Sequence, residues 1–490
     1  MRLRVGLFLV VCLLLGAGLV QLTAPAPPDV TADDRASPGR RPQAATTAEP
    51  KPPQPDLNPP LPQRLAGLVA HEGVAGQVVG VSVTDADGRP VFEHHAGAHL
   101  LPASAQKLPV AAAALATLGP DFRYETMLRA TSRPEPGGVL HGDLVLVGSG
   151  DPALATPQYG QLRPDRPRTP LEALADRVTA GGITRITGAV LGDPGVFPHQ
   201  PQAPGWVPRY LEQGNTTRSS GLTAEGGRRL FIEGGRVRSV PAADPATTAA
   251  AALHALLVER GVVIDGGAAA TATPPPAPVN VGGVTSPPLL DLLRYTLQRS
   301  DNHLADAIFR TIGTASGDAT WAGSAAATRQ ALEALGLDLA GTAMADGSGL
   351  SRGDRLSATF LTALDARMTD STHGSVWRSL MAVAGESGTL QRRLVGSVAE
   401  GRLRGKTGSL QDVMTLSGTV IGPDGSRFHF AVLGNDLDGP GMQAVRRLQD
   451  LVVLALAEDL YGCAWEPAAP PATADPDRPA DQELALVCPT

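Results

Sequence analysis

The sequence predicts a mixed α/β protein in which an antiparallel sheet flanked by helices is interrupted by an inserted α+β domain. Two observations predict the sheet: an alternating apolar pattern with a turn at 78–92, and three successive strand patterns between 402 and 433. The third observation is a change of character at 126–285, where short strand patterns replace the helical ones. We therefore expect a main domain in two parts, 63–125 and 286–465, with a second domain between them.

The first 62 residues predict export and a tether. Arg2 and Arg4 precede an apolar stretch at 5–20, a pattern typical of a secretory signal peptide. This stretch is shorter than the ~20 residues that usually span a membrane, so a signal peptide and an uncleaved membrane anchor both stay open for 1–24. Residues 25–62 are crowded with proline and alanine and lack apolar periodicity, so we expect a disordered tether. The protein is expected to act outside the cytoplasm, at the cell wall or the periplasmic face.

The first part of the main domain combines a hairpin with a helix. Residues 78–83 alternate as a strand, and the chain returns at 90–92 after a turn. An apolar run at 108–118 follows and predicts a helix, because it is too long for an ordinary strand.

The inserted domain and the second part follow in order. For the insert we predict strands at 124–130, 143–147 and 189–191, and helices at 171–180 and 246–260. For the second part we predict helices at 288–299, 304–312, 325–335, 358–368 and 442–460, and antiparallel strands at 402–408, 413–421 and 428–433. The tail at 466–490 is rich in proline, alanine and aspartate, so we expect it to be loose.

Composition excludes some classes of function. The net charge is −7 and no basic run occurs in the folded part, which argues against nucleic-acid binding. No cluster of cysteine and histidine indicates a metal or a cofactor. Of the three cysteines, Cys12 lies in the N-terminal apolar stretch, and for Cys463 and Cys488 a disulfide and two free thiols both stay open.

A serine precedes a lysine by three residues at the start of the apolar run. Residues three apart share one face of a helix, so the Lys107 amine can reach the Ser104 hydroxyl. An uncharged Lys107 could accept the proton of Ser104, and the helix N-terminus would stabilise the alkoxide. The pair therefore predicts a nucleophile with its base, although Ser-x-x-Lys alone also arises by accident.

The scarcity of lysine strengthens this interpretation. Only three of the 41 Lys and Arg residues are lysines, at 51, 107 and 406. Lys51 lies in the predicted tether, and the other two lie in Ser104-x-x-Lys107 and Lys406-Thr407-Gly408. Arginine cannot replace a lysine that must lose its proton, which favours a chemical role for both.

Ser300-Asp301-Asn302 lies between two predicted helices, where a tight link can present Ser300 and Asn302 to a cleft. The alternative is a simple helix cap, since serine and asparagine are favoured there. Lys406-Thr407-Gly408 begins a predicted strand, and its glycine would let a ligand backbone approach closely. The alternative for Lys406 is an exposed strand lysine.

Together the three motifs have the order found in class A β-lactamases and penicillin-binding proteins. The chain most resembles the D-alanyl-D-alanine carboxypeptidase/endopeptidases, the low-molecular-mass class C penicillin-binding proteins of the DacB type. The resemblance rests also on Leu101-Pro102-Ala103-Ser104, 118–122, 142–152, Gly192-Asp193, Phe197, 346–352 and 388–390. It implies the β-lactamase/DD-peptidase fold and a serine peptidase that trims peptidoglycan stem peptides ending in D-Ala-D-Ala, with β-lactams as covalent inhibitors.

The resemblance also implies the roles of the catalytic residues. Ser104 would attack the penultimate D-Ala carbonyl with Lys107 as the base, and Ser300 would bridge the two and relay the proton to the leaving amine. The backbone N–H groups of Ser104 and Ser409 would form the oxyanion hole. No metal or cofactor is implied.

For substrate binding, the resemblance implies that Asn302 holds the substrate amide. Lys406 and Thr407 would bind the terminal carboxylate, beside Gly408 and Ser409 on the same strand. Asp306 departs from the family, which usually has glutamate there, and the insert is shorter than in some relatives.

Two rival functions stay open. A serine β-lactamase would share the acylation step, but a class A enzyme needs a further glutamate that we cannot assign. A non-catalytic penicillin-binding wall sensor would not need both lysines. The balance of exopeptidase and endopeptidase action and the role of the insert are not predicted.

Overall fold

A computed structural model of the chain describes residues 56–71, 73–271, 273–467 and 484–489. The predicted signal peptide or anchor at 1–24 and most of the predicted tether lie outside these residues. Within the described part of the chain, no helix has both the length and the apolar character needed to cross a membrane.

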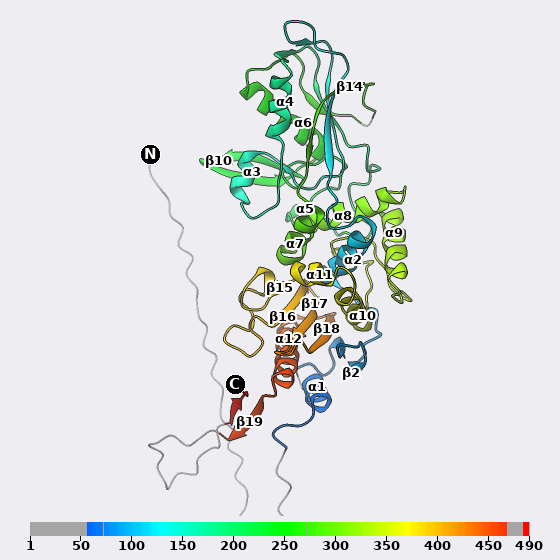
Figure 1. Cartoon of the computed structure of the whole chain (residues 1–490), viewed down its shortest axis with the longest axis vertical. Coiled ribbons are helices and arrows are strands. Elements are labelled where there is room, and N and C mark those ends of the chain that lie inside the picture. Colours follow the sequence, from blue (N-terminus) through cyan, green and yellow to red (C-terminus); the bar gives the residue numbers. More distant parts are fainter. Residues whose placement is uncertain (1–55, 72, 272, 468–483, 490) are drawn as a thin grey trace, which may run out of the picture. The chain divides into compact units, whose positions relative to one another are not determined.

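A six-stranded antiparallel sheet forms the centre of the main domain. Its order is β15 (Ala382–Val383), β16 (Leu403–Ser409), β17 (Met414–Ile421), β18 (Arg427–Asn435), β1 (Val78–Thr84) and β2 (Pro90–His94). β1 pairs with β18, with Val81 opposite Val432, so strands from the two predicted parts of the main domain lie side by side (Figure 1). The predicted class, a mixed α/β fold with an antiparallel sheet, is confirmed.

Helices cover both faces of this sheet because its strands alternate. Phe430 and Val432 of β18 pack into one apolar core with α1 (Leu61–Ala70) and α12 (Gly439–Leu460). Ala431 and Leu433 point to the other face and join a second core. The helices of that second core are α2 (Lys107–Thr117), α7 (Leu289–Arg299), α8 (Asn302–Ala315), α9 (Trp321–Ala334), α10 (Ala358–Thr369) and α11 (Gly374–Leu380).

Helix α1 corrects the predicted tether, which ran to residue 62. The helix begins at Leu61 and carries Pro62 in its first turn, where proline is tolerated. Leu61, Leu65 and Val69 are buried at a spacing of four. The proline-rich approach concealed this short apolar stripe in the sequence.

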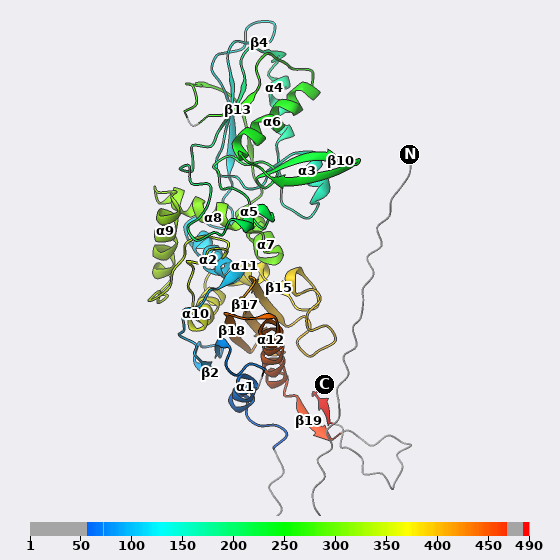
Figure 2. The same ribbon diagram turned by 180° about the vertical axis from the view of Figure 1, so that it is seen from behind.

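The chain between Glu125 and Thr285 forms sheets of its own. A five-stranded sheet has the order β13 (Ala268–Ala270), β9 (Val190–Asp193), β5 (Leu144–Val147), β3 (Glu125–Ala130) and β14 (Val279–Thr285). Its core includes α4 (Glu172–Ala180) and α6 (Pro245–Glu259), which Figures 1 and 2 show beside the sheet. The other elements of this region are β4 (Val139–Leu140), β6 (Leu154–Ala155), α3 (Pro157–Leu162), β7 (Thr169–Pro170), β8 (Arg185–Ile186), α5 (Arg209–Glu212), β10 (Arg228–Glu233), β11 (Arg236–Pro241) and β12 (Val263–Ile264).

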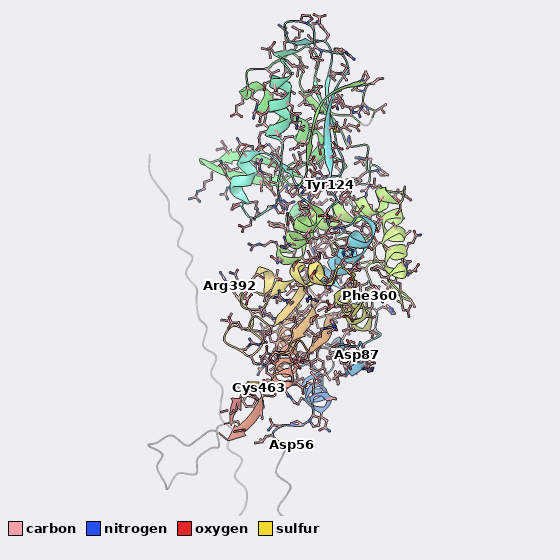
Figure 3. All side chains as sticks on the ribbon, in the orientation of Figure 1. Asp56, Asp87, Tyr124, Phe360, Arg392 and Cys463 are labelled. Carbon is pink, nitrogen blue, oxygen red and sulfur yellow. A yellow bond between two sulfur atoms is a disulfide. The ribbon has the colours of Figure 1, made fainter. Side chains whose placement is uncertain are left out.

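The chain enters and leaves this region at two residues, Tyr124 and Ser286, that lie next to each other in space. The Ser286 amide donates to the Tyr124 carbonyl at 3.0 Å, and the Tyr124 amide donates to the Ser286 hydroxyl at 2.9 Å. Tyr124 is 1% exposed, and Figure 3 labels it where the two regions meet. The geometry agrees with an insertion near the predicted boundaries at 126 and 285, although the division into domains stays a prediction.

We had predicted a loose tail at 466–490. Part of this tail is in fact structured. β19 (Ala464–Pro467) pairs with β20 (Leu484–Val487), and residues 468–483 between them lie outside the described part. Cys463 and Cys488 flank the hairpin and form a disulfide, which resolves the open alternative in favour of the bridge. The cross-link holds β20 beside β19.

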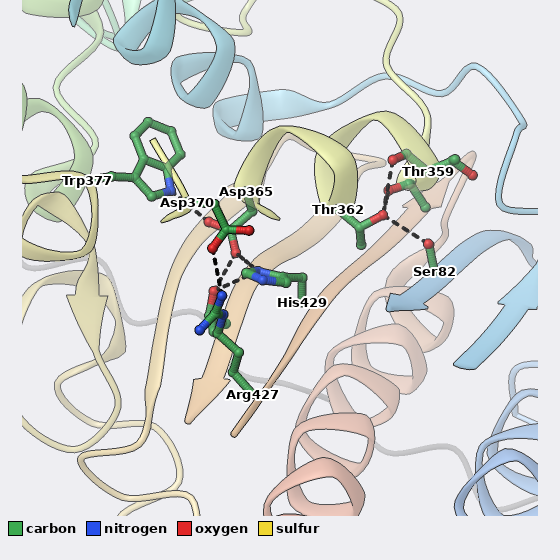
Figure 4. Close-up of polar contacts among 10 residues, drawn as sticks. Ser82, Thr359, Thr362, Asp365, Asp370, Trp377, Arg427 and His429 are labelled. Atoms are coloured by element: carbon green, nitrogen blue, oxygen red, sulfur yellow. Dashed lines mark hydrogen bonds and ion pairs between the residues drawn. The ribbon is translucent and has the colours of Figure 1, made fainter. Parts of the chain in front are cut away.

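A buried polar cluster attaches α10 to the sheet (Figure 4). Asp365 accepts hydrogen bonds from the Trp377 indole at 2.7 Å and from Thr419, and it pairs with His429 Nδ1 at 2.8 Å. Burial would raise the pKa of Asp365, but the hydrogen bonds and the charge of His429 outweigh it and lower that pKa. A carboxylate satisfied in this way is stable in the core and orients α10 against β17 and β18.

Candidate active site

Ser104 lies on a single turn of 3-10 helix, η1 (Ala103–Gln106), that leads directly into α2. The Lys107 ammonium donates to the Ser104 hydroxyl at 2.9 Å, as the spacing of three predicted. Helix α2 is buried on all sides from Lys107 to Leu115, because it runs through the middle of the second core. Lys107 is therefore 1% exposed, while Ser104 keeps access to a cleft.

Two further oxygens hold the Lys107 amine. It donates to Asn302 Oδ1 at 2.7 Å and to the Ser348 carbonyl at 2.6 Å. Burial lowers the pKa of Lys107 to about 8, and the nearby carboxyls of Asp306 and Asp346 keep it from falling further. An amine with this pKa can exist uncharged near neutral pH, which a general base requires.

The motif Ser300-Asp301-Asn302 forms the turn between α7 and α8, and its three residues have different structural roles there. Ser300 has a left-handed backbone with φ of 58°, which ends α7. Asp301 caps α8, since its side chain accepts from the Leu304 amide at 2.9 Å. The cap that we considered for Ser300 or Asn302 is thus formed by Asp301 between them, which leaves both neighbours facing the cleft.

Lys406 is completely buried on β16. Its ammonium donates to the Ser300 hydroxyl at 3.0 Å and to the Thr407 carbonyl at 2.6 Å. Burial, and then the charge of Lys107, hold the pKa of Lys406 well below its usual range. The alternative of an exposed strand lysine is wrong. Thr407 bonds to Thr389 at 2.8 Å through the two hydroxyls.

Gly408 is required by a close approach within the protein itself. A Cβ at this position would lie 2.0 Å from Thr415 Oγ1 and 2.9 Å from the Ser104 amide nitrogen. We had expected the glycine to let a ligand backbone approach. The structure shows that its missing side chain allows η1 to pack closely against β16. The Ser104 amide is thereby held against the strand that carries Ser409.

All eight predicted residues come together at one cleft of about 880 Å³. Six line it: Ser104, Ser300, Asn302, Thr407, Gly408 and Ser409. The two lysines lie behind this lining, each in hydrogen-bond contact with a serine of it. Ser300 contacts Lys406, and its side chain has no hydrogen bond to Ser104 or Lys107 among the described contacts, so the predicted bridging role is not present here.

The loop at 346–352, which the sequence analysis used only as part of the family resemblance, presents the Ser348 carbonyl to Lys107. Asp346 accepts from the Gly349 amide at 2.7 Å and from the Ser351 amide at 2.8 Å. It also accepts from the Trp206 indole at 2.7 Å, so the insert helps to hold this loop. The family motif signalled the loop but not its role, because the contact with Lys107 uses a backbone carbonyl.

The insert also supplies part of the cleft. Arg209, Tyr210 and Asn215 line it, and the Asn215 carbonyl accepts from Asn302 Nδ2 at 2.7 Å. None of the three was predicted, because nothing local distinguishes them from other loop residues. Elsewhere in the described ranges, no three His, Cys, Asp or Glu side chains gather in a way that could hold a metal ion.

Comparison with solved structures extends the fold assignment. Penicillin-binding protein 4 (DacB) from Haemophilus influenzae aligns with a TM-score of 0.67 at 21% identity, covering 79% of this chain and 99% of that one. A second structure of the Haemophilus protein, in complex with a β-lactam, aligns with a TM-score of 0.62 at 22% identity, covering 79% and 98%. The fold is therefore that of the DD-peptidases, as the resemblance implied.

Sequence comparison identifies the family. The chain is 30% identical over 471 residues to a D-alanyl-D-alanine carboxypeptidase from an Actinomadura species, covering 81% of this chain and 84% of the relative. It is 32% identical over 440 residues to carboxypeptidase DacB of Mycolicibacterium smegmatis, covering 86% and 88%. The model of the D-Ala-D-Ala carboxypeptidase 3 (S13) family matches residues 61–233 and 223–456. The chain therefore belongs to this family of serine D-Ala-D-Ala carboxypeptidases.

Proposed function

We propose that this penicillin-binding carboxypeptidase/endopeptidase trims peptidoglycan stem peptides through an acyl-enzyme on Ser104. The observation that carries the proposal is the 2.9 Å contact between the Ser104 hydroxyl and an amine whose pKa is lowered to about 8. The family acts on the cell wall, so the reaction takes place outside the cytoplasm. Export directed by 1–24, as a cleaved signal peptide or as an uncleaved membrane anchor, is part of the same proposal.

Acylation begins when uncharged Lys107 accepts the proton of Ser104. The Ser104 oxygen then bonds to the carbonyl carbon of the penultimate D-Ala. The backbone N–H groups of Ser104 and Ser409 donate to the oxyanion, and each such donor contributes roughly 3–4 kcal/mol to a reaction of this type. The tight fit of Gly408 against the Ser104 amide supports this pair, because it holds η1 and β16 together.

The leaving amine takes a proton from the Ser300 hydroxyl, which takes one in turn from the Lys406 ammonium. The 3.0 Å bond between this hydroxyl and Lys406 supports this role, and Lys406 replaces the Ser104–Lys107 pair that we had expected beside Ser300. The C–N bond then breaks and the terminal residue departs. Water then attacks the ester and gives a proton through Ser300 to Lys406. The C–O bond to Ser104 breaks, and the Ser104 oxygen takes back the proton that Lys107 holds.

Substrate recognition uses the residues along β16 and the start of α8. Asn302 holds the substrate amide, while Lys406 and Thr407 bind the terminal carboxylate. An incoming carboxylate would offset the burial of Lys406 and favour its charged form. β-Lactams act as covalent inhibitors at the same serine, in keeping with the β-lactam complex of the Haemophilus protein.

Intact-mass measurement after addition of benzylpenicillin tests the proposal. We expect a mass increase of one penicillin on the parent and none on Ser104→Ala, with the adduct persisting for many minutes. A synthetic pentapeptide ending in D-Ala-D-Ala should then lose one D-Ala.

The rivals give other results. A serine β-lactamase would clear the adduct within seconds. A wall sensor without catalysis would keep the adduct but leave the pentapeptide intact. A persistent adduct on Ser104→Ala would exclude Ser104 as the nucleophile.

A further inference from the structure

A second cavity of about 440 Å³ adjoins the active-site cleft. Asn215, Ser300 and Asn302 line both. The remaining wall comes from the insert, around α3 and the start of β10, and from the end of α7. The mechanism proposed above uses none of the residues that belong to this cavity alone.

The lining of this cavity is positively charged. Four arginines line it against two aspartates, and the aspartates are already paired: Asp301 with Arg166, and Asp165 with Arg299 at 2.9 Å. Arg163 and Arg228 have no carboxylate within ion-pair distance among the residues that the structure describes. Arg163 is exposed, and Arg228 donates only to the Gly214 carbonyl, at 2.6 Å.

Two buried polar groups of the lining lack partners. Thr216 is 3% exposed, and its hydroxyl has no hydrogen bond within the described chain; nor does Nδ1 of His303. Burial, and then the charge of Arg166, lower the pKa of His303 to about 4, so its ring is neutral. An empty anion-binding site has buried polar groups without hydrogen-bond partners next to guanidinium groups without a carboxylate, and this cavity has both.

We propose that this cavity binds a carboxylate on the leaving-group part of a longer peptide substrate, of the kind that an endopeptidase reaction releases. The proposal rests on the proposed function. Ser300 lies at the entrance to this cavity and bonds to Lys406, the partner assigned to the terminal carboxylate. Ser300 lines both the cleft and the cavity and is the residue assigned to the leaving amine, so we place the group held in the cavity on the leaving side of the scissile bond. A single D-Ala leaves it empty, whereas a leaving residue with a long acidic side chain can reach Arg163 and Arg228.

The test compares two substrates that share one acyl donor. The donor ends in D-Ala linked to D-2-aminopimelate, whose side chain ends in a carboxylate, or to the ω-amide of the same residue. We expect the parent to prefer the acid by about fivefold in kcat/KM, the upper range for a partly exposed ion pair. Arg163→Gln/Arg228→Gln should remove this preference.

Controls separate this result from misfolding and from failure of the proposed function. The double variant should be acylated by benzylpenicillin and release D-Ala from the pentapeptide within about twofold of the parent, since neither reaction fills the cavity. Arg163→Gln alone should at least halve the preference, because it removes one of the two unpaired guanidinium groups. Its side chain is exposed and makes no hydrogen bond within the described residues, so this variant should fold. Arg236→Gln, an exposed arginine on β11 of the insert, should keep the full preference.

Two outcomes would overturn the proposal. They are equal rates for acid and amide in the parent, and an unchanged preference in the double variant. If the parent neither binds penicillin nor releases D-Ala, the proposed function itself fails.

Discussion

Replacing Lys107 with arginine tests the general base directly. Lys107→Arg keeps a positive charge but removes an amine that can lose its proton, because guanidinium stays protonated in proteins. The Lys107 ammonium also meets three oxygens, those of Ser104, Asn302 and Ser348. A planar, larger head group cannot meet these three acceptors with the same geometry.

The magnitude follows from the two pKa values. The pKa of Lys107 is lowered to about 8, so a substantial fraction is uncharged near neutral pH. The pKa of an arginine guanidinium lies several units higher, so its uncharged form is far rarer at the same pH. Burial would lower the arginine pKa and narrow this difference. We still expect acylation to fall by at least about a thousandfold, near the level of Ser104→Ala.

The assay is the rate of labelling by a fluorescent penicillin, with a thermal melt to verify folding. Lys406→Arg is the matched control, because Lys406 bonds to Ser300 and not to Ser104. Its acylation should be slowed but measurable. If folded Lys107→Arg is acylated within about tenfold of the parent, a barrier change of roughly 1.4 kcal/mol, Lys107 is not the base.

Three further outcomes are expected. Acylation should rise as pH increases through about 8, because Lys107 must be uncharged to accept a proton and its pKa is lowered to about 8; a rate independent of pH would contradict this. Thiol labelling of the denatured, unreduced chain should modify neither Cys463 nor Cys488, and replacing both with serine should destabilise the C-terminal hairpin by about 3 kcal/mol, measured by proteolysis. Asp365→Ala should lower the free energy of unfolding by about 3–5 kcal/mol, because it leaves buried partners unpaired, whereas Asp370→Ala on the surface should cost less than about 1 kcal/mol; equal effects in denaturant titration would refute the comparison.

Most elements of the fold could be predicted because their periodicity is local. The predicted strands at 413–421 and 428–433 correspond to β17 and β18, and the predicted helix at 358–368 corresponds to α10. Helix α1 and the hairpin of β10 and β11 were missed, because a proline-rich approach hides the first and exposed strands weaken the second. The pairing of β1 with β18 could not be predicted from local pattern, since it joins residues more than 300 positions apart.

By itself, the sequence determined the chemistry that this protein can perform. Ser104 and the two folded-region lysines are recognisable because their side-chain types and spacing suit nucleophilic catalysis, and because arginine replaces lysine elsewhere. Only the tertiary structure decided how reactive these groups are. The lowered pKa of Lys107 arises from burial inside a core built by helices far apart in the chain, and its third acceptor is a backbone carbonyl at Ser348. Desolvation and backbone contacts depend on packing rather than on residue type, so no local pattern contains them.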